Sequence, residues 1–184
     1  MRKAVMVRCK PLLALMLAGS AAAEVPALPP VSAPACRITA GSGEVDFGRR
    51  GAGEDRIAAR SIALTVGCSL AGAMALRISG PARGEDFSWG SGDSILRIVV
   101  SRARLDGSGV ELQRLDAGGA RRGEAAGSLT LSPGEGLMPV RHGAPLSGRL
   151  LSLELALTPA PGERDRHPAR LIRLETGIRV TLLP

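Results

Sequence analysis

The sequence contains very few aromatic residues: no tyrosine, two phenylalanines and one tryptophan in 184 residues. Proteins that hold single strands of nucleic acid stack the bases on aromatic side chains. This chain offers almost no such surface, so we do not expect it to bind nucleic acid. Trp89 is the only large aromatic platform for a sugar ring, and in its Gly-rich segment it is expected to pack locally.

Histidine is equally scarce, and the motifs of common catalytic and cofactor sites are missing. His142 and His167 both lie in segments with the composition of loops, and neither lies at a spacing typical of zinc ligands. The chain has no G-x-S-x-G nucleophile elbow, no P-loop and no G-x-G-x-x-G fingerprint. We therefore expect no enzymatic activity, no bound metal and no cofactor.

Long apolar runs are absent after the first 23 residues. That leader has a basic start, the apolar segment PLLALMLAGSAAA and a final Ala21-Ala22-Ala23, the small-residue pattern that signal peptidase cleaves. We expect residues 1–23 to be a signal peptide and the exported chain to begin at Glu24; an uncleaved anchor is the competing interpretation. No later run approaches the roughly 18 apolar residues of a membrane-spanning helix, so no integral span is expected.

Lysine is confined to the leader, and every later basic residue is arginine. Four of the 24 basic residues leave with the leader, which leaves 20 against 17 acids and lowers the net charge from +7 to +3. The pairs Arg49-Arg50 and Arg121-Arg122 are flanked by glycines and acids, and we expect them to be solvated charges in loops.

Cysteine is limited to three residues, and Cys9 lies in the leader. In an exported chain, the remaining pair most simply forms a disulfide between Cys36 and Cys68. Closing this loop of about 33 residues should stabilise the fold by roughly 3–4 kcal/mol in the chain-entropy model.

What the sequence does contain is an alternation of apolar and polar residues with a period of two. Apolar residues share one face in each of these runs: Ile62, Leu64, Val66 and Cys68; Met74, Leu76 and Ile78; Leu96, Ile98 and Val100; Val110 and Leu112; Leu151, Leu153, Leu155 and Leu157; Ile172, Leu174, Ile178, Val180 and Leu182. Half-buried antiparallel strands need this period, because successive side chains point to opposite faces of a sheet. About seven short strands separated by Gly, Pro and Ser clusters predict an all-β sandwich over residues 36–184, after a Pro-rich extension over residues 24–35.

Several short motifs in this domain resemble those of chaperone–usher fimbrial subunits, the pilin-like proteins of the β-fimbrial group of secreted fimbrial-like proteins. Cys36 is followed by GSGEVDFG (41–48) and then by SIALTVGCS (61–69), and the late runs LSGRLLSLELALTPAP and RLETGIRVTLLP resemble the family's closing strands. By this resemblance Cys36 opens the first strand and Cys68 closes the second. Val45 and Phe47 of the VDFG motif would then be core residues, and Gly48 would permit a turn.

The resemblance implies an immunoglobulin-like sandwich that lacks its last strand and therefore has a hydrophobic groove. A periplasmic chaperone fills such a groove first, and at the outer-membrane usher another fimbrial subunit replaces it by β-strand addition. The protein would pass through the periplasm to a fimbrium at the cell surface and support adhesion. The groove would be lined by Ile172, Leu174, Ile178, Val180 and Leu182. The alternative is that these five are ordinary core residues of a complete sandwich, a self-contained secreted immunoglobulin-like binding module.

The Pro-rich extension is expected to be a poor donor strand. Pro26, Pro29, Pro30 and Pro34 lack the backbone N–H that a strand flanked on both sides must donate. The domain would then receive a strand without giving one, which favours a tip, minor or terminal component of a fibre over the major repeating subunit.

A strand-exchange assay tests this expectation. A synthetic peptide of residues 24–35 should fail to displace a chaperone from a partner fimbrial subunit, because its prolines interrupt the hydrogen-bond ladder. Displacement of the chaperone by this peptide would contradict the assignment of a poor donor.

Overall fold

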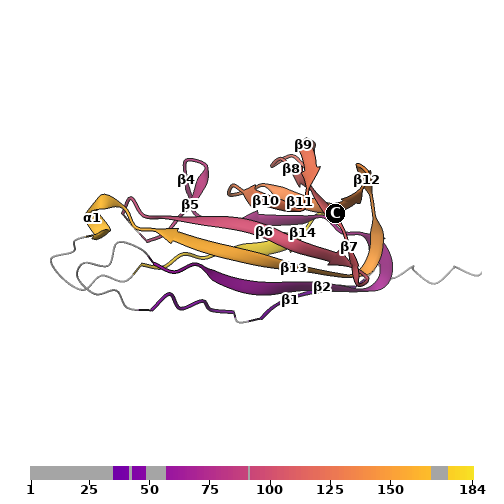
Figure 1. Cartoon of the computed structure of the whole chain (residues 1–184), viewed down its shortest axis with the longest axis horizontal. Coiled ribbons are helices and arrows are strands. Elements are labelled where there is room, and N and C mark those ends of the chain that lie inside the picture. The colour runs from indigo at the N-terminus through magenta and orange to yellow at the C-terminus, as the bar shows by residue number, and fades with distance from the viewer. Residues whose placement is uncertain (1–34, 42, 49–56, 91, 167–173) are drawn as a thin grey trace, which may run out of the picture. The chain divides into compact units, whose positions relative to one another are not determined.

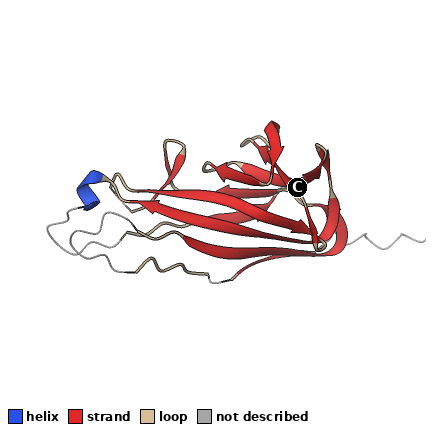
Figure 2. Cartoon of the chain, viewed as in Figure 1, coloured by secondary structure: helices blue, strands red, loops and turns tan. Residues whose placement is uncertain are grey.

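A computed structural model of the chain describes residues 35–41, 43–48, 57–90, 92–166 and 174–184 (Figure 1). Almost all of the regular structure is β-strand, and the strands form two antiparallel sheets, so the all-β prediction is confirmed. The one described helix, α1 (Glu163–Arg166), is a single turn at one end of the long strands (Figure 2). The predicted signal peptide, almost all of the Pro-rich extension and the Arg49-Arg50 pair lie outside the described residues.

The first sheet is built around three long neighbouring strands. In order across the sheet its strands are β1 (Cys36–Ala40), β2 (Arg60–Ala73), β13 (Ser147–Ala160), β6 (Ile95–Leu105), β5 (Asp86–Ser88) and β4 (Ala82–Arg83). Two further strands also pair with β6, namely β7 (Ser108–Gly109) and β10 (Ser128–Leu131). β1 is therefore an edge strand, with β2 as its only described neighbour.

The second sheet is made of shorter strands. In order they are β14 (Arg179–Leu182), β3 (Leu76–Ser79), β11 (Gly136–Arg141), β8 (Glu111–Leu115) and β9 (Arg121–Ala126), and β12 (Ala144–Pro145) pairs with β11. The C-terminal strand β14 thus forms one edge of this sheet, as β1 forms one edge of the other.

Apolar side chains from both sheets form a single buried cluster, which is the packing of a β-sandwich. Most of the side chains placed inward by the period-two pattern are buried: Leu64, Val66, Met74, Leu76, Ile78, Leu96, Ile98, Val100, Leu112, Leu151, Leu153, Leu155 and Leu157. The cluster also contains Phe87 and Trp89, so the lone tryptophan is a packing residue as expected.

Two local expectations are wrong. Arg121 and Arg122 are exposed, as predicted, but they begin strand β9 and do not lie in a loop. Cys68 does not close the second strand, because β2 continues past it to Ala73. Apart from the exposed Leu70 in β2, the residues that continue the strand in both places are small or charged, and their pairing with a neighbouring strand outweighs their composition.

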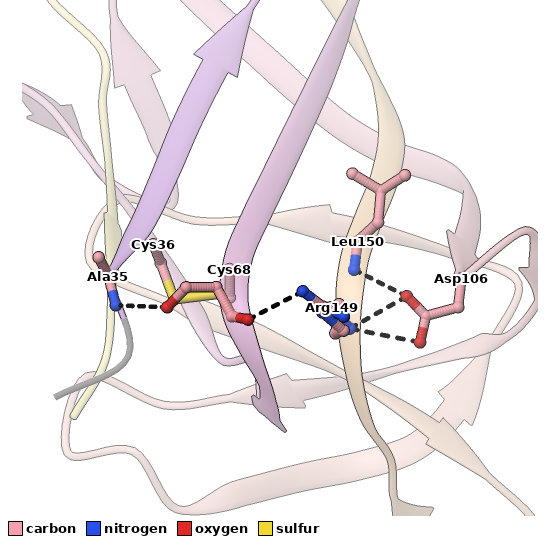
Figure 3. Close-up of a disulfide and its surroundings, with 7 residues drawn as sticks. Ala35, Cys36, Cys68, Asp106, Arg149 and Leu150 are labelled. Carbon is pink, nitrogen blue, oxygen red and sulfur yellow. Dashed lines mark hydrogen bonds between the residues drawn. A yellow bond between two sulfur atoms is a disulfide. The ribbon is translucent and has the colours of Figure 1, made fainter. Parts of the chain in front are cut away.

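The predicted disulfide is present and joins the two strands at directly opposed positions. Cys36 and Cys68 face each other in the register of β1 and β2, with their Cα atoms 4.0 Å apart (Figure 3). Two hydrogen bonds next to the disulfide also join these strands. The N–H of Ala35 donates to Oγ of Ser69 at 3.1 Å, and the N–H of Ser69 donates to the carbonyl of Ala35 at 3.0 Å. The bond therefore holds the edge strand β1 on the sheet.

Beside the disulfide, the carboxylate of Asp106 holds an irregularity in β13 (Figure 3). Asp106 has a φ of 49° in the turn between β6 and β7, and its Oδ1 accepts the N–H groups of Arg149 at 3.0 Å and Leu150 at 2.8 Å. The guanidinium of Arg149 in turn donates to the carbonyl of Ser69 at 2.9 Å. One turn residue thus connects β6, β13 and the disulfide-bearing strand β2.

Replacing Asp106 tests this connection. Asp106→Ala removes the acceptor for two backbone N–H groups. Alanine also lacks the polar side chain whose local hydrogen bonds help aspartate to adopt a positive φ. We therefore expect a loss of about 1–3 kcal/mol in the free energy of unfolding. The matched control, Asp106→Asn, keeps one oxygen acceptor and tolerates the left-handed region, and it should lose less than about 1 kcal/mol. Denaturant unfolding with the disulfide intact measures both, and equal losses would contradict the role assigned to the carboxylate.

Candidate functional site

The C-terminal strand β14 has strand partners on one side only. It pairs with β3 along its whole length and stands at the end of the strand order. On the β3 side just beyond the strand, the N–H of Leu183 donates to the carbonyl of Ala75 at 2.8 Å. Before the strand, the N–H of Gly90 donates to the carbonyl of Glu175 at 2.8 Å. No described strand pairs with the other side, which we call the free edge.

The backbone groups along this segment alternate in direction. In an antiparallel ladder every second residue exchanges hydrogen bonds with the same neighbour. Because Leu183 donates to Ala75 and stands in the same phase as Arg179 and Thr181, these odd-numbered residues are bonded toward β3. Val180 and Leu182 therefore direct their N–H and C=O groups to the free edge, where an added strand could bond to them.

The even-numbered residues also carry a row of partly exposed side chains. We define the β14 row as Leu174, Thr176, Ile178, Val180 and Leu182; each is half-buried, and each residue between them is exposed. The four apolar members pack against the core cluster from its margin. Central core residues differ, since Leu153 is only 4% exposed. The row is an apolar surface that the described strands cover incompletely.

A matching row lies on the edge of the other sheet. We define the β1 row as the half-buried residues Ile38, Val45 and Phe47, which also pack against the core cluster. The ring of Phe47 meets that of Trp89 edge-on, with the ring centroids 5.5 Å apart and the planes at 65°. The next residue, Gly90, touches the β14 row, because a Cβ there would lie 2.6 Å from Cδ2 of Leu174. The two edges therefore converge on the segment Trp89–Gly90.

Most of the residues singled out from the sequence lie at these two edges. Leu174, Ile178, Val180 and Leu182 belong to the β14 row, and Val45 and Phe47 belong to the β1 row. Ile172 and His167 lie outside the described residues. Gly48 has a φ of 81°, and its N–H donates to Oδ1 of Asp46 at 2.7 Å, so the VDFG motif ends in a turn.

One member of the β14 row, Thr176, was missed from the sequence. Only apolar residues were assigned to the inward face, and a threonine in a strand is usually read as an outward residue. The strict alternation from Leu174 to Leu182 was the signal that could have found it, because it puts position 176 in phase with its apolar neighbours.

His142 lies away from both rows. It is exposed, with a φ of 50°, in the turn between β11 and β12, on the rim of a hollow of about 500 Å³ that Arg102, Arg141 and Glu111 also line. Arg102 is engaged in an ion pair with Glu154 at 3.1 Å. In the described part of the chain, no three His, Cys, Asp or Glu side chains are grouped so that they could hold a metal ion, and no helix is long and apolar enough to cross a membrane.

Compared with known proteins, the chain matches no protein-family model, no curated protein and no solved structure.

The residues just before β14 pack closely against Gly80, the residue that follows β3. A Cβ on Gly80 would lie 2.8 Å from the carbonyl oxygen of Gly177 and 3.1 Å from Cδ1 of Ile178. A hollow of about 360 Å³ adjoins this contact, lined by Ser79, Gly80, Gly177, Ile178 and Arg179. The contact sets how near the β14 row lies to the core.

A pair of glycine substitutions tests the importance of this contact. Gly80→Ala should push the segment before β14 outward and lower the free energy of unfolding by about 1–3 kcal/mol, because a backbone carbonyl stands where the new methyl group would go. The control is Gly177→Ala, whose Cβ meets nothing within 4 Å; it should be neutral or slightly stabilising. Unfolding curves measure both variants, and an equal loss for the two would contradict the close approach.

Proposed function

We propose that the chain is a non-enzymatic structural subunit of a bacterial chaperone–usher fimbria, with an immunoglobulin-like sandwich that receives its last strand from another molecule. In this account a periplasmic chaperone binds the free edge of β14 first. A strand from another fimbrial subunit replaces it at the outer-membrane usher, and the finished fibre supports adhesion at the cell surface. The chain would be exported and would reach the fibre through the periplasm.

The observation that carries the proposal is the coincidence of two features on the β14 row. Val180 and Leu182 direct backbone groups to the free edge, where no described strand pairs with them, and their half-buried apolar side chains lie at the core margin. An edge of this kind is a template for another strand and a liability in solution if it is left open. β-Strand addition would cover both features, since the main chain of the added strand bonds to the free edge and its alternate side chains pack on the β14 row.

The sequence supports the proposal independently of the edge. The leader directs export, the Cys36–Cys68 disulfide suits an oxidising compartment, and the VDFG and closing-strand motifs resemble fimbrial subunits. The Pro-rich extension favours a position at the tip, at the end or among the minor components of the fibre.

Supplying a strand in cis tests the proposal. The exported chain is extended after Pro184 by a short Gly/Ser linker and a strand of alternating Val and Thr, which can fold back along β14. We expect a gain of about 3 kcal/mol, or roughly 6–12 °C in Tm, because the valines cover the β14 row. The unextended chain should aggregate or be degraded when it is produced without a chaperone.

The control carries the same linker and strand with proline at alternate positions, which removes the N–H donors and should abolish the gain. If the unextended chain is a stable monomer and the Val/Thr strand adds nothing, the sandwich is complete within the chain. That outcome would favour a self-contained secreted binding module over a fimbrial subunit.

A further inference from the structure

The β14 row is not uniformly apolar, because Thr176 stands between Leu174 and Ile178. Its Oγ1 is buried and has no hydrogen-bond partner among the residues that the structure describes. Thr176 lies three residues before β14, and its side chain is in phase with those of Val180 and Leu182. A strand added at the free edge and continuing past the start of β14 would therefore pass next to it. Rotation about one staggered torsion, χ1, can turn the oxygen toward that strand without moving the backbone.

The hydroxyl of Thr176 is already buried without a described partner before any strand is added. A strand with only apolar inward side chains would leave it unpaired. A buried hydroxyl without a partner costs about as much as the hydrogen bond it has lost. An incoming strand that offers a hydrogen bond at this one position avoids the cost, and one that does not is disfavoured.

We propose that Thr176 is a specificity-determining residue: the strand received at β14 comes from a different protein and carries Ser, Thr or Asn at the inward position facing Thr176, with apolar inward residues on either side. This inference rests on the function proposed above and adds the chemistry of the partner. It makes one position of the donor strand polar in an otherwise apolar pattern.

A second copy of this chain does not fit that requirement. One face of its extension offers the alternate residues Val25, Ala27, Pro29, Val31 and Ala33, none of which can donate or accept a side-chain hydrogen bond. The other face contains Ser32 but also Pro26, Pro30 and Pro34. Prolines there remove the main-chain donors that strand addition needs. The donor is therefore a chain of another sequence.

A panel of synthetic strands tests the proposal on the full exported chain. The parent peptide has eleven residues of alternating inward Val and outward Thr, and each panel member replaces one inward Val by Ser. The chain is refolded from denaturant with each fluorescently labelled peptide, and the dissociation constant is measured by anisotropy. We expect one Ser peptide to bind about tenfold more tightly than the all-Val parent, because it pairs with the hydroxyl of Thr176.

Two variants of the protein test whether the preference for the Ser peptide comes from Thr176. Thr176→Val, which is nearly isosteric, should reverse the ranking, so that the all-Val peptide binds more tightly than the same Ser peptide. The matched control is Thr181→Val, because Thr181 is also in the segment but is exposed between two members of the row; it should keep the wild-type ranking.

The outcomes separate this inference from the function on which it rests. If no peptide of the panel binds the wild-type chain, strand addition at β14 is overturned, and this inference falls with it. If peptides bind but every Ser member is weaker than the all-Val parent, or if Thr176→Val leaves the ranking unchanged, only the role of Thr176 is overturned.

Discussion

A strand in a sheet has hydrogen-bonding groups on two sides, and among the described strands β14 has a partner on one side only. Its bonds to β3, and that of Leu183 to Ala75 just beyond its end, lie on the same side. The strand phase that leaves alternate backbone groups free also turns the side chains of those residues toward the core. One geometric constraint thus produces both the unpaired edge and the half-covered apolar row. A strand that forms hydrogen bonds with the edge would also cover the apolar side chains of the row.

Other contacts fix the edge strand of the first sheet and join it to the segment before β14. The disulfide holds β1 on the first sheet, and the carboxylate of Asp106 ties the neighbouring irregularity of β13 to the same region. At the other end, the contact of Phe47 with Trp89 and that of Leu174 with Gly90 bring the two edges together. A segment held in place by such contacts loses less conformational entropy when a partner binds, which favours tight strand addition.

Much of the fold follows from the period-two pattern. The rows led by Leu64, Leu96 and Leu151 were predicted from alternation alone and are buried, because their strands are long and each has one apolar face. β9 was missed, since its sequence RRGEAA has no apolar face and forms a strand only by pairing with β8. Two-residue strands such as β4 and β7 depend on their neighbours in the same way, and no local pattern can reveal them.

The candidate site was predictable only in part. The apolar members of the β14 row have the alternating pattern of any half-buried strand, so the sequence left open whether they line a groove or a closed core. The exposure of that row depends on which strands become neighbours, and this is a property of the assembled sheets. Thr176 escaped notice for a related reason: a polar side chain on an inward face is recognisable only when the phase of the strand is known.

Amide hydrogen exchange, resolved residue by residue along the C-terminal segment of the isolated chain, tests the central claim most directly. The account predicts alternation: the amides of Val180 and Leu182 exchange rapidly because they face the free edge, while those of Thr181 and Leu183 are protected by bonds to the β3 side. Adding a strand that fills the row should then protect Val180 and Leu182 as well. Equal protection of all four amides in the isolated chain would mean that the edge is already paired, and would contradict the account.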